Sequence, residues 1–423
     1  MPADHQETPG AGETDHPHRS GQASLSYAPL WRRVLPLRLS AGMSSMADGV
    51  VKSSAPLLAA SLTSDPRAVA TVAMGALAAW FTGLLSGALT DRLSRRTVLI
   101  WTEVIRATCL ATFAVMIVID RAGVALVAIT AFLMTTGTTF YDASGQAILP
   151  RLVGREVTTL SRQNGRLHMV ETAGRSLVGT PLGSVTFALA PVLPFALAAL
   201  SHGGSAQAVR RLPRAAGDPD VARRRPLRTE IWTGLVYLVR DRSLLTMSLY
   251  TAAFNFADAV AMAVFVLFAK ADLGVSDAAY GLLLLGLAVG NVLGGGLAGW
   301  LGQFHWSTIM LASAAVQSLG WAVIVNTGSP WVAATLLVFM GVGQTVTTVS
   351  IVSTRQAMVP DHLLGRVIAG FRVIGNGSAV FGAAAGGFVA AAFGLSAAPW
   401  TSAGFLMATA LSLLWIAVRR PLD

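Results

Sequence analysis

The chain has 423 residues, of which 53% are hydrophobic and only 12% are charged, and its formal net charge is +10. Soluble proteins carry about 25% charged residues, so we exclude a water-soluble globule and expect an integral membrane protein. The single cysteine, Cys109, excludes an intramolecular disulfide and any cysteine-based zinc or iron–sulfur site. We expect no cofactor and no metal site.

Twelve apolar segments follow one another along the chain, each near the length of about 20 residues that a membrane-spanning helix needs. The first six cover residues 35–62, 68–89, 97–119, 122–145, 162–184 and 186–203. The second six cover residues 244–270, 277–300, 306–326, 329–352, 366–392 and 396–418. This pattern predicts an all-α membrane protein with twelve transmembrane helices in two bundles of six.

The basic residues indicate how the helices are oriented, because short cytoplasmic loops are enriched in Lys and Arg. The chain ends and alternate loops hold most arginines, whereas the opposite loops hold only Arg67, Arg121 and Lys270. We therefore expect a multi-pass protein of the cell membrane with both termini in the cytoplasm. Since the loops account for the positive charge, no nucleic-acid partner is expected.

Four regions follow from these segments. Residues 1–30 are polar and are expected to form a disordered cytoplasmic tail, and residues 31–203 the first six-helix bundle. Residues 204–243 read as a cytoplasmic linker, in which residues 229–240 are predicted to form an amphipathic helix on the membrane surface. Residues 244–423 would form the second bundle.

The two halves of the chain repeat each other. Gln146-Ala-Ile-Leu-Pro150 matches Gln356-Ala-Met-Val-Pro360 at a spacing of 210 residues, and Asp48 matches Asp258 at the same spacing. The spacing includes an even number of spans, so the halves have parallel topology and are related by an axis along the membrane normal. This arrangement predicts a cavity between the halves near the midplane.

The segment from Gly87 to Arg96, between the second and third spans, reads Gly-Ala-Leu-Thr-Asp-Arg-Leu-Ser-Arg-Arg. It resembles the loop signature Gly-x-x-x-Asp-Arg-x-Gly-Arg-Arg of the major facilitator superfamily, with Ser94 in place of the second glycine. The segments that end at Pro150 and Pro360 resemble the branch that contains enterobactin and macrolide exporters. The resemblance implies the major facilitator fold, small-molecule transport by a single chain, and a conformational latch made by Gly87, Asp91, Arg92, Arg95 and Arg96. Alternatively, these arginines only set the topology.

Charged residues inside the spans are the candidates for function, because each costs about 2.5–3.5 kcal/mol or more in the hydrocarbon core. Asp48 and Lys52 lie four residues apart, on one face of the first span. The repeat points Asp48 and Asp258 at the central cavity, where a carboxylate can load and release a proton. The alternative is a structural Asp48–Lys52 ion pair with Asp258 hydrogen-bonded inside its bundle.

A polar stripe runs along the fifth span, with spacings of four, three, four and four residues. It consists of Asn164, His168, Glu171, Arg175 and Gly179. The stripe indicates a path for substrate or protons, or else a Glu171–Arg175 salt bridge between helices. Glu103 and Arg106 of the third span are expected to form a structural pair. If a proton relay exists, Arg106 or Arg175 supplies its positive charge.

The energy source is restricted by the two lysines, Lys52 and Lys270. Neither follows a glycine, so the chain has no phosphate-binding P-loop and cannot by itself pump with ATP. An enzyme is disfavoured, because no Ser/His/Asp or metal-ligand constellation lies at the midplane. The segment Gly179-Thr-Pro181-Leu-Gly183 resembles the antiporter signature of this superfamily.

These observations favour proton-coupled efflux of a small apolar or amphipathic organic compound. Its partners would be that substrate, protons and the lipid bilayer. Two alternatives stay open, an uptake permease or facilitator for a nutrient and a membrane scaffold or sensor that transports nothing.

Overall fold

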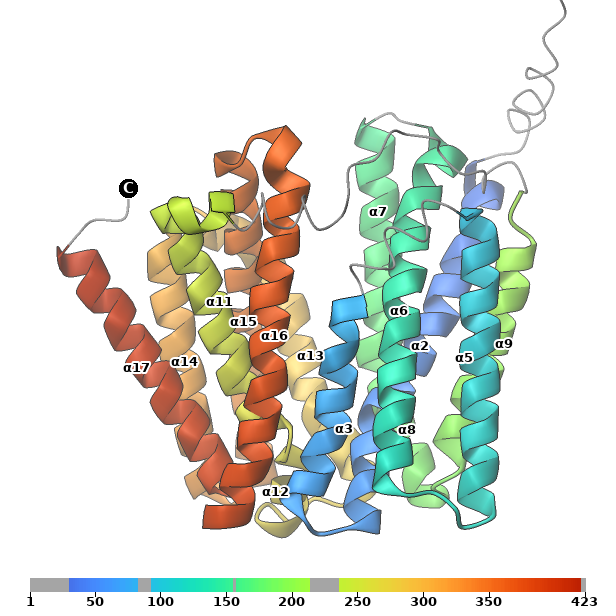
Figure 1. The fold of residues 1–423 in the computed structure, drawn as a ribbon, viewed down its shortest axis with the longest axis horizontal. Helices are drawn as coiled ribbons and strands as arrows, with labels where there is room; N and C mark the ends of the chain where they lie inside the picture. The colour runs from blue at the N-terminus through green and yellow to red at the C-terminus, as the bar shows by residue number, and fades with distance from the viewer. Residues whose placement is uncertain (1–29, 83–92, 155–156, 214–235, 420–423) are drawn as a thin grey trace, which may run out of the picture.

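The computed structural model describes residues 30–82, 93–154, 157–213 and 236–419. These residues form two side-by-side groups of helices that cross the molecule from end to end (Figure 1). The fold is that of an all-α membrane protein, as the sequence predicts. Eight helices of the described ranges are long and apolar enough to cross a membrane.

The first group contains six crossings. They are formed by α2 (Leu30–Leu62), by α3 (Pro66–Ala78) with the 3₁₀ turn η1 (Ala79–Thr82), by α5 (Arg95–Val118), by α6 (Val124–Val153), by α7 (Val157–Thr172) with the π-helix η2 (Ala173–Gly179) and α8 (Thr180–Leu189), and by α9 (Leu193–Arg210).

The second group follows the same order. Its crossings are α11 (Arg242–Met262) with α12 (Phe265–Ala271), α13 (Asp277–Leu301), α14 (Trp306–Thr327), α15 (Pro330–Met358), α16 (Asp361–Phe393) and α17 (Ala397–Arg419).

The predicted boundary between the fifth and sixth spans was wrong. Gly183 and Ser184 lie inside α8, which continues to Leu189, and α9 begins at Leu193. The chain turns where Pro191 follows the helix end, because proline favours an extended conformation in the residue before it. The sixth crossing therefore extends to Arg210, into the segment that we assigned to the linker. Of the predicted amphipathic helix, residues 236–240 are described and helical, and the rest lies outside the described residues, as does the tail up to residue 29.

The described chain begins at Leu30 and ends at Arg419 at the same end of the molecule (Figure 1). Near the opposite end, the two groups touch. The Ser184 hydroxyl of α8 donates to the Ala278 carbonyl of α13 at 3.2 Å, and Gly387 of α16 packs against Pro66 and Ala70 of α3. Since Gly387 has no side chain, the two backbones approach closely there.

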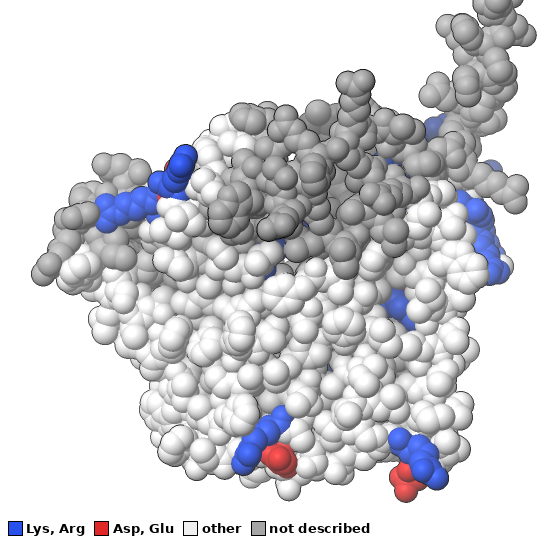
Figure 2. All heavy atoms as spheres, viewed as in Figure 1, with Lys and Arg blue, Asp and Glu red and all other residues white. Residues whose placement is uncertain are grey.

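The outer surface suits a lipid environment. On the face shown in Figure 2, most of the described surface is uncharged, and charged atoms gather mainly near the two ends. Large apolar side chains are exposed around the molecule, including Trp331 at 82% and Phe393 at 80%. A water-soluble protein rarely exposes such extensive apolar surface.

Candidate functional site

The centre of α2 carries Asp48, which lies between two arginines from other helices. Arg106 of α5 donates to Asp48 Oδ1 through Nη2 and is 1% exposed, and Nη2 of Arg175 lies 3.5 Å from Asp48 Oδ2. The predicted alternative of an Asp48–Lys52 pair is therefore wrong. Lys52 lies one turn further along α2, and the arginines that reach Asp48 from neighbouring helices take its place as partners.

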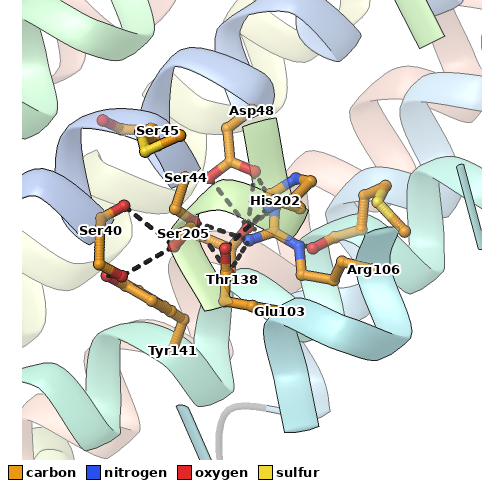
Figure 3. A network of polar contacts seen from close by, with 12 residues as sticks. Ser40, Ser44, Ser45, Asp48, Glu103, Arg106, Thr138, Tyr141, His202 and Ser205 are labelled. Carbon is orange, nitrogen blue, oxygen red and sulfur yellow. Dashed lines mark hydrogen bonds and ion pairs between the residues drawn. The ribbon is translucent and has the colours of Figure 1, made fainter. Parts of the chain in front are cut away.

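Arg106 is held by several groups at once (Figure 3). Its Nη1 donates to Glu103 Oε1 at 3.2 Å and to Ser44 Oγ at 3.1 Å, while Nη2 also donates to Thr138 Oγ1 at 3.2 Å. The pairing of Glu103 with Arg106, three residues apart on α5, is as expected. Gly137 of α6 makes room for the chain of Arg106, which a Cβ at that position would overlap.

Glu103 continues this network to α9. Its Oε1 accepts a hydrogen bond from Ser44 Oγ at 3.0 Å, and its Oε2 lies 3.0 Å from Nδ1 of His202. Glu103 and His202 are both 0% exposed. Two carboxylates and two guanidinium groups balance in charge if the imidazole is neutral, with its proton on Nδ1 facing Glu103. Buried charges are stable only when they are paired in this way.

A second set of buried hydroxyls lies next to this network. Ser40 Oγ lies 2.6 Å from the Tyr141 hydroxyl and 2.7 Å from Ser205 Oγ. These bonds connect α2, α6 and α9, the same helices that surround Glu103 (Figure 3).

Arg175 lies in the π-helix η2. The Thr180 amide donates to the Arg175 carbonyl, five residues back, and Thr180 Oγ1 also donates to that carbonyl at 3.1 Å. The adjacent α2 approaches closely, because a Cβ at Gly49 would overlap the Arg175 carbonyl. π-Helical turns are rare and occur frequently at functional sites.

The predicted stripe on the fifth span does not form one surface. Asn164 and His168 are exposed, Glu171 is half-buried with Oε2 4.0 Å from His168 Nδ1, and Gly179 is buried against α2. The stripe divides because η2 changes the helical period between Thr172 and Thr180. Arg175 ion-pairs with Asp48, and it interacts electrostatically at longer range with Glu171 and with Asp142 of α6.

Lys52 and Asp258 belong to different bundles and interact electrostatically. The Lys52 side chain is exposed although it comes from the middle of α2, and it interacts electrostatically with Asp258 of α11 and with Arg175. The structure shows no ion pair between Lys52 and any described residue within 4 Å. Asp258 is half-buried. That both side chains line a central cavity stays a prediction.

The predicted latch is described only in part, since Gly87, Asp91 and Arg92 lie outside the described residues. Arg95 and Arg96 start α5, where the Ser94 hydroxyl accepts from the Thr97 amide at 3.3 Å. The Arg96 guanidinium donates to the Arg210 carbonyl at 2.6 Å, at the C-terminal end of α9, where cations are favoured. The role of these arginines as a latch stays a prediction.

The sequence pattern did not single out His202, nor the hydroxyls of Ser44, Thr138 and Tyr141. One signal was available for His202, because a titratable residue within an apolar span marks a functional site by default. The hydroxyls gave no such signal, since serine and threonine also occur in membrane helices wherever helices pack closely.

Comparisons with known proteins agree with this architecture. A family model described as "transmembrane secretion effector" matches residues 24–421. No curated protein matches the chain.

Several solved transporters have a similar fold. A bacterial homologue of the iron transporter ferroportin, in an inward-facing state, is 13% identical over 92% of this chain and 99% of its own, with a TM-score of 0.73. The nucleoside transporter NupG is 13% identical over 90% of this chain and 98% of its own, with a TM-score of 0.71. A bacterial homologue of the human lysosomal transporter Spinster is 14% identical over 91% and 96%, with a TM-score of 0.70. At these identities the likeness concerns the fold alone.

Proposed function

The chain belongs to the transmembrane secretion effector family and is a membrane transporter of the major facilitator class. From this premise, we propose that it exports a small apolar or amphipathic organic compound in exchange for protons. The word "secretion" in the family description supports export. The resemblance of the Pro150 and Pro360 segments to enterobactin and macrolide exporters supports the substrate class.

The observation that carries the proposal is the position of Asp48 between a buried and a partly exposed arginine. Asp48 is 12% exposed and Arg175 is 37% exposed, whereas Arg106 is 1% exposed. A proton can therefore reach Asp48 from the side of Arg175, and its arrival breaks the Asp48–Arg175 attraction. The membrane potential supplies about 2.3 kcal/mol per charge at 100 mV, and a proton gradient adds to this, so one or two protons per cycle suffice for a roughly hundredfold substrate gradient.

The contacts between the bundles support alternating access. They lie at the end opposite Leu30 and Arg419, where Ser184 bonds to Ala278. With both termini in the cytoplasm, as the arginine distribution predicts, these contacts would close the extracellular end. A central cavity lined by Lys52 and Asp258 would then receive substrate from the cytoplasm.

The decisive experiment measures substrate-dependent proton flux in proteoliposomes with a panel of amphipathic compounds and a trapped pH dye. We expect Asp48→Asn and Asp258→Asn each to reduce the flux, because neither amide can carry a proton. Asp120→Asn is the matched control, since Asp120 is exposed at the end of α5 and has a positive φ of 55° that asparagine also tolerates. Wild-type flux in both test variants would overturn the proton coupling.

Direction and activity are tested separately. For an exporter, accumulation in energised inverted vesicles exceeds that in energised whole cells, and an uptake permease gives the reverse. A scaffold or sensor predicts no flux, and no thermal stabilisation of the protein by any compound of the panel.

A further inference from the structure

The two arginines around Asp48 are held very differently. Arg106 is fully buried, and its guanidinium contacts Asp48, Glu103, Ser44 and Thr138. Among the described residues, Arg175 has one ion pair within 4 Å, to Asp48 at 3.5 Å. Arg106 is therefore fixed by groups from three helices, whereas a single ion pair holds the Arg175 guanidinium.

Two other carboxylates, besides Asp48, also attract Arg175. Glu171 and Asp142 attract the Arg175 guanidinium at longer range. Arg175 also lies in a π-helix, whose hydrogen bonds join residues five apart instead of four. When Asp48 is neutral, these two carboxylates are the negative charges that attract Arg175. Arg106, in contrast, keeps the Glu103 carboxylate as its counter-charge whatever the state of Asp48.

Glu103 can serve as the counter-charge of Arg106 only if its carboxylate stays ionised and in place. A hydrogen bond from His202 would hold it so. Oε1 of Glu103 faces Arg106 and Ser44, and Oε2 faces Nδ1 of His202 at 3.0 Å. No described group bonds to Nε2 of His202, which is buried. A protonated ring would leave an unpaired N–H there, so the neutral ring that donates from Nδ1 to Glu103 fits the site.

We propose that Glu103 and His202 are positioning residues: they fix Arg106 as a permanent counter-charge, so that proton loading of Asp48 releases Arg175 alone. The inference rests on the proposed proton-coupled function, in which Asp48 is the group that loads. In that step a proton adds to an Asp48 oxygen, the ion pair to Arg175 breaks, and Arg175 turns toward Glu171 and Asp142. The titratable and charged groups around the cluster are Lys52 of α2, Glu103 and Arg106 of α5, Tyr141 and Asp142 of α6, Glu171 of α7, Arg175 of η2, His202 of α9, Asp258 of α11 and Arg372 of α16.

The test uses the full chain in lipid nanodiscs and needs no substrate. A protonated carboxyl group adds across a C=N bond of N,N′-dicyclohexylcarbodiimide, and the product rearranges to a stable N-acylurea. Peptide mass spectrometry then locates this adduct. We expect Asp48 to be labelled in the wild-type protein, faster at pH 6 than at pH 8. Glu103 should remain unlabelled, because in this proposal Arg106, Ser44 and His202 hold it ionised. Labelling of Glu103 in the wild-type protein would overturn the inference.

The variants separate positioning from simple structure. His202→Gln keeps an N–H donor for Glu103 and should label like the wild type. His202→Leu removes the donor, so that Glu103 takes up a proton. Arg106 then pairs with Asp48 alone and keeps Asp48 ionised. The labelling rate of Asp48 should therefore fall at least threefold. Glu103→Gln should produce the same fall, and Arg175→Gln should raise the labelling rate of Asp48. If Glu103→Gln does not fold, the two His202 variants decide the question.

The outcomes distinguish this inference from the function on which it rests. Wild-type labelling of Asp48 in both His202→Leu and Glu103→Gln, with substrate-dependent proton flux intact, overturns the positioning role and leaves the transporter assignment standing. Equal loss in His202→Gln and His202→Leu also overturns it, since a space-filling role does not require the donor. If Asp48 is not labelled in the wild-type protein, proton loading fails and the inference fails with it.

Discussion

The two bundles derive from one repeat, yet their buried polar groups are arranged differently. The first bundle buries Glu103, Arg106 and His202 around Asp48. In the second, Tyr250, Gln317 and Ser318 are buried neutral side chains that donate to backbone carbonyls of neighbouring helices, at 3.1, 2.9 and 2.8 Å. Such bonds fix helix positions without the cost of burying charge. The second bundle also buries an arginine, Arg355, but places it over the Phe371 ring.

The repeat shows where the difference arose. At a spacing of 210 residues, Asp48 corresponds to Asp258, whereas Glu103 corresponds to Ser313, Arg106 to Val316, Arg175 to Ala385 and His202 to Ser412. The acid is present in both halves, but its basic partners are present in the first half alone. We therefore expect the arginine-paired proton site to lie in the first bundle, and Asp258 to carry its proton without a basic partner from its own half.

Glycine packing dominates the second bundle. Gly286, Gly290 and Gly294 of α13 lie directly against the Ala334, Val338 and Val342 carbonyls of α15. An i,i+4 spacing of small residues lets the backbones of two membrane helices approach closely, and these three glycines do so here. Close backbone contact at glycines thus holds the second bundle, whereas the first has such contacts at Gly49 and Gly179 and a charge network in addition.

The largest effect should come from breaking that network. Arg106→Gln leaves Asp48 and Glu103 without their shared counter-charge, and the loss of one member of a buried ion pair costs about 3–5 kcal/mol. The free energy of unfolding, measured in mixed micelles, should fall by that amount. The control Arg121→Gln removes an exposed loop arginine and should change it by less than about 0.5 kcal/mol. Equal stability of the two variants would contradict the charge network as a source of structure.

A smaller effect should follow from disturbing the packing of the second bundle. A Cβ at Gly290 would overlap the Val338 carbonyl, so Gly290→Ala should destabilise by about 1–3 kcal/mol. At Gly295, on the same helix, a Cβ would meet nothing within 4 Å. Gly295→Ala should therefore be neutral, or stabilising by about 0.5–1 kcal/mol, since alanine favours helices over glycine. A similar loss at both positions would show that helix propensity, and not close approach, controls this bundle.

The smallest effect concerns the contact between the bundles. Because the structure shows no ion pair between Lys52 and Asp258 within 4 Å, their attraction in this state should be weak. A double-mutant cycle with Lys52→Gln and Asp258→Asn should give a coupling energy below about 1 kcal/mol. A coupling of several kcal/mol would mean that the populated state has the two side chains in direct contact, and that the bundles are closed around them.

Much of the candidate site was accessible from the sequence, but its connections were not. Asp48, Arg106 and Arg175 stand out because a charged residue inside an apolar span is energetically costly and indicates a functional site. The sequence suggested Lys52 as the partner of Asp48, since residues four apart share a helical face. In the folded chain, Arg106 and Arg175 arrive from other helices and pair with Asp48, while Lys52 interacts electrostatically with Asp258 of the second bundle.

The membrane class, the order of the crossings and the duplication can be read from the sequence, because apolar run length and repeat spacing do not depend on how the helices pack. The sequence also marked the few charges that a bilayer would exclude. The folded chain was needed to see that His202 contacts Glu103, that Gly137 makes room for Arg106, and that a π-helix carries Arg175. These contacts depend on how helices rotate and approach one another, and packing between elements far apart in the chain sets that rotation.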